Sequence, residues 1–148
     1  MVEQLRRADV TWTGDLDSGS GTINQVTSGA VSSLPVSWRS RTEDPEGRTS
    51  PEELLAAAHA ACFSMSFSSR LAKAGYPPER LETSAEIVFR KLEPGWKVAE
   101  SRITVRARVQ GIPEDEFQRA AQGARDGCPI SVALQGNVEL SVDATLES

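Results

Sequence analysis

The sequence predicts an α+β fold in which a mostly antiparallel sheet is wrapped on a long, buried central helix. Three observations predict this fold. Segments in which apolar and polar residues alternate, as they do in strands, lie on both sides of one long segment with helical start and stop signals. A second, shorter helical pattern precedes the last strand. The predicted order is hairpin, helix, hairpin, helix, strand, in a single domain of residues 1–148.

The N-terminal third predicts a hairpin followed by an irregular loop. Residues 8–13 can form a strand, residues 14–21 are rich in glycine, aspartate and serine as in a turn, and residues 22–33 predict a second strand. The stretch 35–48 contains proline and glycine and predicts a loop. The arginines of this loop are Arg39, Arg41 and Arg48.

The central helix is predicted to begin at Pro51 and to end near Gly75. Ser50 is a suitable N-cap, and Glu53 follows three residues later as in a capping box. Residues 54–69 contain no aspartate, glutamate, lysine or arginine, whereas a surface helix of this length would have a charged face. We therefore expect the central helix to be buried on nearly all of its sides. The segment is too short and too rich in serine to span a membrane.

The second half predicts two alternating strands, residues 83–90 and 102–109, around a turn at 93–95. Residues 113–126 predict a helix with an apolar stripe, and a final strand is expected over 138–146. The second strand has a polar face rich in arginine. We expect this face to be the solvated side of an antiparallel sheet, with a binding patch as the alternative. Its arginines are Arg102, Arg106 and Arg108.

Composition excludes several classes of function. An apolar content of 39% and a charged content of 25% are ordinary for a globular protein, and a net charge of −5 argues against a nucleic-acid or anionic-membrane partner. The N-terminus has no apolar run and so predicts no signal peptide, which makes the cytoplasm the expected location. With one histidine, two cysteines and no ligand cluster or phosphate loop, neither a metal nor a cofactor is expected.

The cysteines are the strongest candidates for chemistry. Cys62 lies in the alanine-rich helix, where a cysteine is usually a core residue. Cys128 lies between a glycine and a proline at the expected start of a short helical turn, a position that stabilises a thiolate. A lone His59 on an apolar helix is more often a packed residue than a base. Local reasoning alone favours Cys128 as the attacking thiol.

Two long motifs resemble one family. The segment SPEELLAAAHAACFSM around Cys62 and the segment GCPIS around Cys128 closely resemble the OsmC/Ohr family of osmotically inducible and organic-hydroperoxide-resistance proteins. The HAACFSM form and the loop WRSRTEDPEG are similar to the OsmC branch. The resemblance covers nearly the whole chain, including the N-terminal segment WTGDLDSGSG.

This resemblance implies a thiol-dependent peroxidase that reduces organic hydroperoxides and, less efficiently, hydrogen peroxide. It implies an intertwined homodimer, and it places the reactive cysteine at Cys62 and the second cysteine at Cys128. The family's glutamate falls on Glu52. Its arginine matches Arg41 best, with Arg39 as the neighbouring alternative.

The implied chemistry is a thiolate that becomes a sulfenic acid, a second thiol that condenses with it to a disulfide, and a dithiol, of the lipoyl type by resemblance, that reopens the disulfide. An arginine near the thiol would favour the thiolate, and a glutamate would hold the arginine. The alternative is a redox-sensing or ligand-binding protein without turnover, in which the disulfide is a switch. A plain structural domain with two buried cysteines is a third reading.

Helical geometry predicts how these residues assemble. Glu52 and Cys62 are ten residues apart, which is roughly 15 Å along a helix axis. A glutamate side chain cannot span that distance. If both serve one site, either an intermediate residue bridges them or Glu52 comes from a second chain. We expect a second chain, with two central helices packed through their alanines.

Overall fold

The structure is a computed structural model that describes residues 1–147. The chain divides into two compact units, residues 1–53 and a unit that begins at Leu54. Mixed helices and strands confirm the predicted α+β class. The prediction of a single domain over 1–148 stays a prediction.

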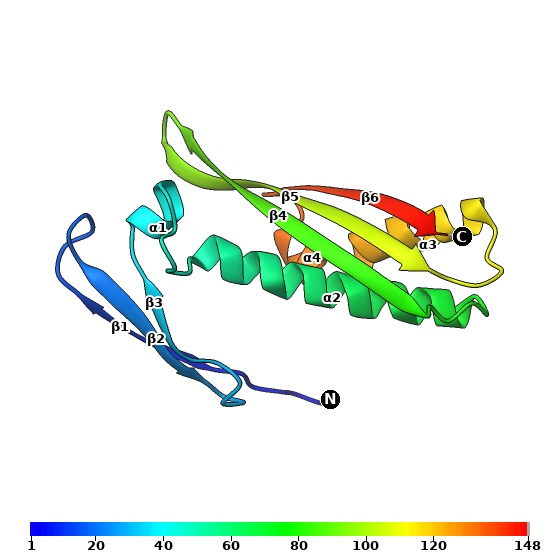
Figure 1. The fold of residues 1–148 in the computed structure, drawn as a ribbon, viewed down its shortest axis with the longest axis horizontal. Coiled ribbons are helices and arrows are strands. Elements are labelled where there is room, and N and C mark those ends of the chain that lie inside the picture. The colour runs from blue at the N-terminus through cyan, green and yellow to red at the C-terminus, as the bar shows by residue number, and fades with distance from the viewer. Residues whose placement is uncertain (148) are drawn as a thin grey trace. The chain divides into compact units, whose positions relative to one another are not determined.

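The first unit contains a three-stranded antiparallel sheet in the order β1-β2-β3 (Figure 1). Its strands are β1 (Ala8–Thr13), β2 (Ser20–Val26) and β3 (Ser32–Val36). The predicted second strand is therefore two strands, separated by a turn in which Gly29 has φ 74°. Pro35, where the predicted loop begins, is tolerated in a strand because β3 is an edge strand. The short helix α1 (Arg39–Thr42) follows where no regular structure was expected.

The helix α2 (Pro51–Lys73) is the predicted central helix. Ser50 caps it as expected, since the Glu53 backbone N–H donates to Ser50 Oγ at 3.1 Å. The carboxylate of Glu53 accepts a hydrogen bond from the Thr49 hydroxyl instead of completing the capping box.

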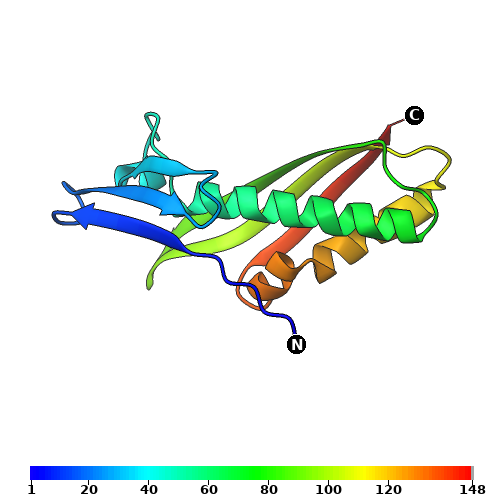
Figure 2. The same ribbon diagram turned by 90° about the horizontal axis from the view of Figure 1, so that it is seen from below.

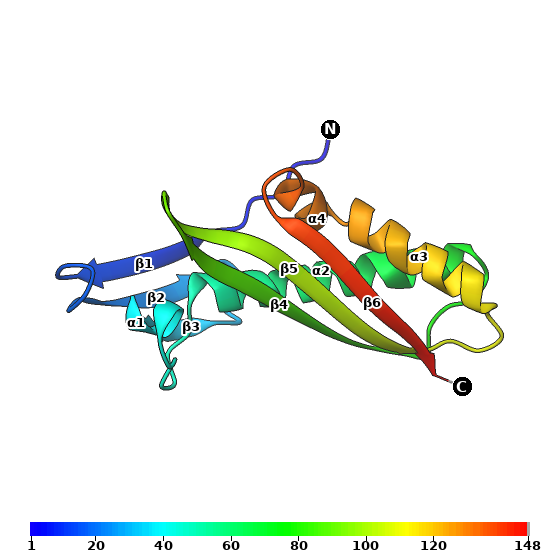
Figure 3. The ribbon, with the colours of Figure 1, turned by 90° about the horizontal axis from the view of Figure 1, so that it is seen from above.

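In the second unit a mixed sheet in the order β4-β5-β6 lies behind α2 in Figure 2 and in front of it in Figure 3. Its elements are β4 (Arg80–Leu92), β5 (Gly95–Arg108), α3 (Glu114–Gly127), α4 (Pro129–Leu134) and β6 (Glu139–Glu147). The hairpin of β4 and β5 is antiparallel, whereas β6 returns after two helices and pairs with β5 in parallel.

The core of the second unit forms where α2 and α3 pack on one face of this sheet. Phe67 of α2 stacks at a tilt between Phe63 and Phe117, with ring centroids 5.5 and 5.4 Å apart. The other face of β5 has the solvated arginines that the sequence predicts. Arg102 pairs with Glu100 at 3.1 Å, so this face is an ion-paired surface.

Burial of α2 differs from the prediction. One stripe is buried within the chain, and residues on the opposite side are exposed, Leu54 by 36% and Met65 by 72%. Among the described residues of the second unit, this helix packs its buried side on the sheet and α3, so a single chain buries the side that faces them. The buried stripe consists of His59, Phe63, Phe67 and Leu71.

Candidate functional site

The two cysteine side chains meet at the first turn of α4. Cys128 is the N-cap of this helix, as predicted, and its sulfur accepts a hydrogen bond from the Ser131 backbone N–H at 3.3 Å. Cys62, which lies half-buried on α2, is close enough to the Cys128 thiol and to the backbone N–H of Ile130 for both groups to affect its pKa. Both cysteines are free thiols. Residues distant in sequence thus form one dithiol pair.

Burial raises the pKa of the Cys62 thiol. The hydrogen bond from the Ile130 backbone N–H opposes this shift and lowers the pKa, whereas the Cys128 thiol raises it further. The net direction is upward. Cys62 therefore needs additional positive charge if its thiolate is to predominate near neutral pH.

Cys62 opens onto a surface depression of about 700 Å³. Apolar atoms of Ala58, Ala61 and Met65 line one part of it, and the cationic side chains of Arg70 and Lys73 line another. The depression can therefore accommodate an apolar group beside a polar or anionic one.

Arg70 lies close to two glycines of α3. A Cβ atom added at Gly123 would lie 2.6 Å from Arg70 Nη1, and one added at Gly127 would lie 2.5 Å from Nη2. The absence of side chains at these two positions makes room for the guanidinium.

Arg41 and Glu52 form a second pair, in the first unit. Arg41 Nε and Nη2 each donate to a different oxygen of the Glu52 carboxylate, and both distances are 2.9 Å. Glu52 is 8% exposed, and the Arg41 side chain is 29% exposed and also lies 5.3 Å from the centre of the Trp38 ring. The carboxylate fixes the guanidinium in a bidentate geometry.

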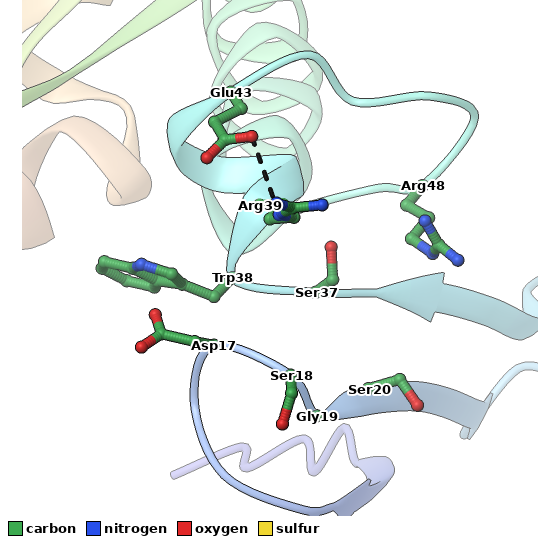
Figure 4. A pocket seen from close by; sticks show the side chains of 9 residues that line it. All are labelled: Asp17, Ser18, Gly19, Ser20, Ser37, Trp38, Arg39, Glu43 and Arg48. Carbon is green, nitrogen blue, oxygen red and sulfur yellow. Dashed lines mark ion pairs between the residues drawn. The ribbon is translucent and has the colours of Figure 1, made fainter.

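The alternative arginines have different surroundings. Arg39 and Arg48 line a depression of about 640 Å³ together with Asp17 and Glu43, as Figure 4 shows. Arg39 lies 3.7 Å from Glu43, and both side chains are largely exposed. This pocket combines two cations with two acids and does not include Arg41. Of the two arginines weighed from the sequence, Arg41 is the one that pairs with Glu52.

A buried histidine adjoins the dithiol pair. His59 Nδ1 lies 2.6 Å from Ser101 Oγ, and Nε2 lies 2.8 Å from Ser131 Oγ. The Cys128 thiol donates to the same Ser131 hydroxyl at 3.1 Å. Sequence reasoning missed both serines. The spacing Cys-Pro-Ile-Ser, from an N-cap to the third helical position, was a local signal for Ser131, whereas nothing in the sequence indicates Ser101.

The described residues 1–147 contain no group of three or more histidine, cysteine, aspartate or glutamate side chains that could hold a metal ion. Within the same range, no helix has both the length and the apolar character needed to cross a bilayer.

Comparison with known proteins assigns the chain to a family. A family model described as OsmC-like protein matches residues 43–143. The chain is 35% identical over 143 residues to the protein named Peroxiredoxin OsmC of Escherichia coli, covering 97% of each. It is 28% identical to the organic hydroperoxide resistance protein OhrA of Bacillus subtilis, covering 70% of this chain and 72% of that one.

Solved structures agree in fold. An organic hydroperoxide resistance protein OsmC from Legionella pneumophila superposes with a TM-score of 0.70 at 23% identity, covering 97% of this chain and 99% of that chain. OhrB of Bacillus subtilis gives a TM-score of 0.68 over 94% of this chain and 98% of that chain, also at 23% identity. The resemblance carried by the two cysteine motifs is confirmed, and the chain belongs to the OsmC family.

Proposed function

We propose that this protein is a cysteine-based peroxidase that reduces organic hydroperoxides and, more weakly, hydrogen peroxide. The contact between the Cys62 and Cys128 thiols carries the proposal, because a dithiol pair can close to a disulfide after one thiol is oxidised. The relatives named peroxiredoxin and organic hydroperoxide resistance protein support a peroxide-related function.

The proposed cycle has three steps. The Cys62 thiolate attacks the terminal oxygen of the hydroperoxide, the O–O bond breaks, and the alkoxide leaves as an alcohol after taking up a proton. The Cys128 sulfur then attacks the Cys62 sulfenic sulfur, which forms a disulfide and releases water. An external dithiol, of the lipoyl type by family resemblance, reduces the disulfide by exchange and becomes a disulfide itself.

Exposure supports Cys62 as the attacking thiol. Cys128 is fully buried, whereas Cys62 is half-buried and lines an open depression. Local reasoning favoured Cys128 because of its helix terminus, but the Ile130 N–H gives Cys62 a share of the same terminus. The apolar lining from Ala58, Ala61 and Met65 suits an alkyl-bearing peroxide.

Arg41 is proposed to supply the positive charge that Cys62 needs. Its bidentate bond to Glu52 holds the guanidinium in one orientation, which reduces the entropy lost when it binds an anion or a peroxide. In this proposal Glu52 positions Arg41 and does not contact the peroxide.

A homodimer is proposed as the active form. Leu54, Ala57, Ala61 and Met65 leave an exposed apolar face on α2 that a second copy can cover. Because Glu52 and Cys62 are ten positions apart on one helix, each site is proposed to combine the Arg41–Glu52 pair of one chain with the cysteines of the other. A fully active monomer of about 16 kDa in sedimentation would contradict this arrangement.

Free-thiol counts before and after one equivalent of cumene hydroperoxide test the proposal. We expect two thiols per chain to disappear and a small dithiol to restore them through many turnovers. The raised pKa of Cys62 favours one competitor, a slow redox-sensing protein, which would lose both thiols but show no turnover with any dithiol. No loss of thiols would contradict both readings.

A further inference from the structure

His59 is the centre of a buried chain of hydrogen bonds that ends at the Cys128 thiol. Its ring is 0% exposed and reaches Ser101 through Nδ1 and Ser131 through Nε2. Ser131 in turn receives the hydrogen bond of the Cys128 thiol. Two hydroxyls would be enough to satisfy a buried imidazole. The further hydrogen bond between Ser131 and the Cys128 thiol is therefore not needed to satisfy the His59 ring.

Counting the hydrogen atoms shows which group donates in each hydrogen bond between Cys128 and Ser101. A thiol has one hydrogen, and here Cys128 donates it to Ser131 Oγ. The single hydroxyl hydrogen of Ser131 is then available for His59 Nε2, at an O–N distance of 2.8 Å. The neutral ring must in that case carry its own hydrogen on Nδ1 and donate it to Ser101. Each donor meets one acceptor, so a proton can move from the thiol toward the ring.

We propose that His59, acting through Ser131, accepts the proton of Cys128 while this thiol closes the disulfide with Cys62. Ser131 contacts the reacting sulfur, and His59 is a positioning residue behind it. The proposal rests on the proposed function, because it concerns the step in which the sulfenic acid is resolved.

Disulfide closure moves the Cys128 proton to His59 and then returns a proton to the leaving hydroxide. The thiol proton passes to the Ser131 hydroxyl as the hydroxyl proton passes to Nε2, and the Cys128 sulfur forms a bond to the Cys62 sulfur. The S–O bond of the sulfenic acid breaks, and hydroxide leaves. The imidazolium returns one proton through Ser131 to this hydroxide, which becomes water. The products are a disulfide, one water molecule and neutral His59.

The electrostatic surroundings keep His59 ready to accept a proton. Burial lowers the pKa of His59, so the ring is neutral at pH 7 and regains that state after the transfer. The groups that face the ring are the hydroxyl of Ser101 from β5 and that of Ser131 from α4. Beyond Ser131 the titratable groups are the thiols of Cys128 and, next to it, Cys62.

The acceleration of disulfide closure by proton transfer to His59 has an upper limit. A cysteine thiol with an ordinary pKa of about 8.5 is about 3% thiolate at pH 7. Assistance that removes the proton during the attack can therefore accelerate the step by at most about thirtyfold at pH 7. The same assistance adds less at pH 9.5, because hydroxide in solution is then abundant enough to take the thiol proton.

The first test reads the tautomer and does not depend on activity. The chain has a single histidine, so protein labelled with ¹⁵N-histidine gives the NMR signals of one ring. We expect a neutral ring protonated at Nδ1 at pH 7, and a shift of the Nε2 signal in Ser131→Ala. A ring protonated at Nε2 overturns the proposal, because its hydrogen would point at the Ser131 oxygen and block the transfer.

The second test measures disulfide closure after one equivalent of cumene hydroperoxide in rapid-quench experiments. We expect His59→Gln and Ser131→Ala to form the Cys62 sulfenic acid within twofold of the wild-type rate, and to close the disulfide roughly tenfold more slowly at pH 7. The deficit should shrink at pH 9.5, and Ser131→Thr, which keeps a hydroxyl, should restore most of the rate.

A matched control removes another hydroxyl from the second unit. Ser64 Oγ on α2 donates to the Ala60 carbonyl at 2.8 Å and lies 2.7 Å from the Thr83 hydroxyl, which can donate to it. Ser64→Ala should therefore cost similar stability without slowing closure. A deficit in His59→Gln that is equal at both pH values, or a Ser64→Ala variant as slow as Ser131→Ala, would mean a packing role and overturn the proposal.

Failure of the proposed function would be visible separately. If the wild type does not react with any hydroperoxide, the peroxidase proposal fails. Closure of the same disulfide can then be driven by the thiol oxidant diamide. The variants should again be slow at pH 7 relative to Ser64→Ala if the relay operates, and equally fast if it does not.

Discussion

Arg41 and Arg39 offer a matched pair of substitutions on one short helix. Arg41 holds the buried Glu52 through two hydrogen bonds of 2.9 Å, whereas Arg39 lies 3.7 Å from the exposed Glu43. Each arginine is replaced by alanine in the same four-residue helix. The two variants therefore remove the same side chain and differ in the pair that is lost.

The expected costs in unfolding free energy differ several-fold. Removing one partner of a fully buried pair costs about 3–5 kcal/mol, because a charge remains buried without its partner. Arg41 is 29% exposed, so water can reach part of the carboxylate in Arg41→Ala, and about 2 kcal/mol is the reasonable figure. Exposed pairs contribute about 0–1 kcal/mol, and we expect the lower half of that range for Arg39→Ala. The predicted loss in Tm is about 4–8 °C for Arg41→Ala and less than about 2 °C for Arg39→Ala.

The assay combines thermal unfolding at pH 7 with the rate of Cys62 oxidation at pH 7 and pH 9.5. If Arg41 supplies the proposed charge, Arg41→Ala slows oxidation more at pH 7 than at pH 9.5, and Glu52→Ala shows the same trend more weakly. Arg41→Lys keeps the charge but loses the bidentate geometry, so we expect an intermediate rate. Arg39→Ala serves as the control for both readouts.

Two outcomes would refute this reasoning. Equal losses of Tm in Arg41→Ala and Arg39→Ala would mean that the buried ion pair has no particular value. Wild-type oxidation rates in Arg39→Ala, Arg41→Ala and Arg48→Ala across the pH range would mean that none of these arginines activates Cys62.

Three further predictions concern the second unit. Cys62→Ser should abolish peroxide reduction, and Cys128→Ser should allow one turnover and trap a sulfenic acid at Cys62. If mass spectrometry finds the first oxidised species at Cys128, the two cysteines have the opposite roles. Because burial lowers the pKa of His59, its neutral form stabilises the fold above the ordinary value of about 6.5 and this contribution is lost as pH falls. The Tm of the wild type should therefore fall more than that of His59→Gln between pH 7 and pH 5, and parallel curves would contradict this. Met65→Glu places a charge on the exposed face of α2 and should yield monomers in sedimentation if this face is a dimer interface; an unchanged dimer would exclude it.

Local patterns predicted most elements because their physical signals are local. The start of α2 is set by a cap at Ser50, and the start of α4 by Cys128 and the proline that follows it. From Ser101 to Arg108 the strand β5 alternates between buried and exposed residues, as its sequence predicts. The strand β3 was not predicted as a separate strand, because its residues fall partly in the predicted second strand and partly in the predicted loop from residue 35; its proline is compatible with a strand only because β3 lies at the sheet edge.

The candidate site was less predictable because its contacts are between distant segments. Both cysteines were identified, but their meeting depends on the docking of α4 against α2, which spacing in the sequence does not encode. The Ile130 N–H is a backbone group and leaves no side-chain signature. Ser101 reaches His59 from another element, 42 positions along the chain, so its role appears only in the fold.

Burial within one chain does not explain why residues 54–69 of α2 lack charged side chains. Successive helical residues point about 100° apart, so His59, Cys62 and Met65 lie on different sides of the helix. His59 is in the buried stripe, Cys62 is half-buried at the edge of that stripe beside the first turn of α4, and Met65 is exposed. A charge on the first side would be buried in the core, and an acid on the second would raise the pKa of Cys62 further. Within one chain, nothing explains why the exposed side that contains Met65 also lacks charged residues. The same composition is explained if a second chain covers that side, so the exposed face and the charge-free sequence support the proposed dimer through separate observations.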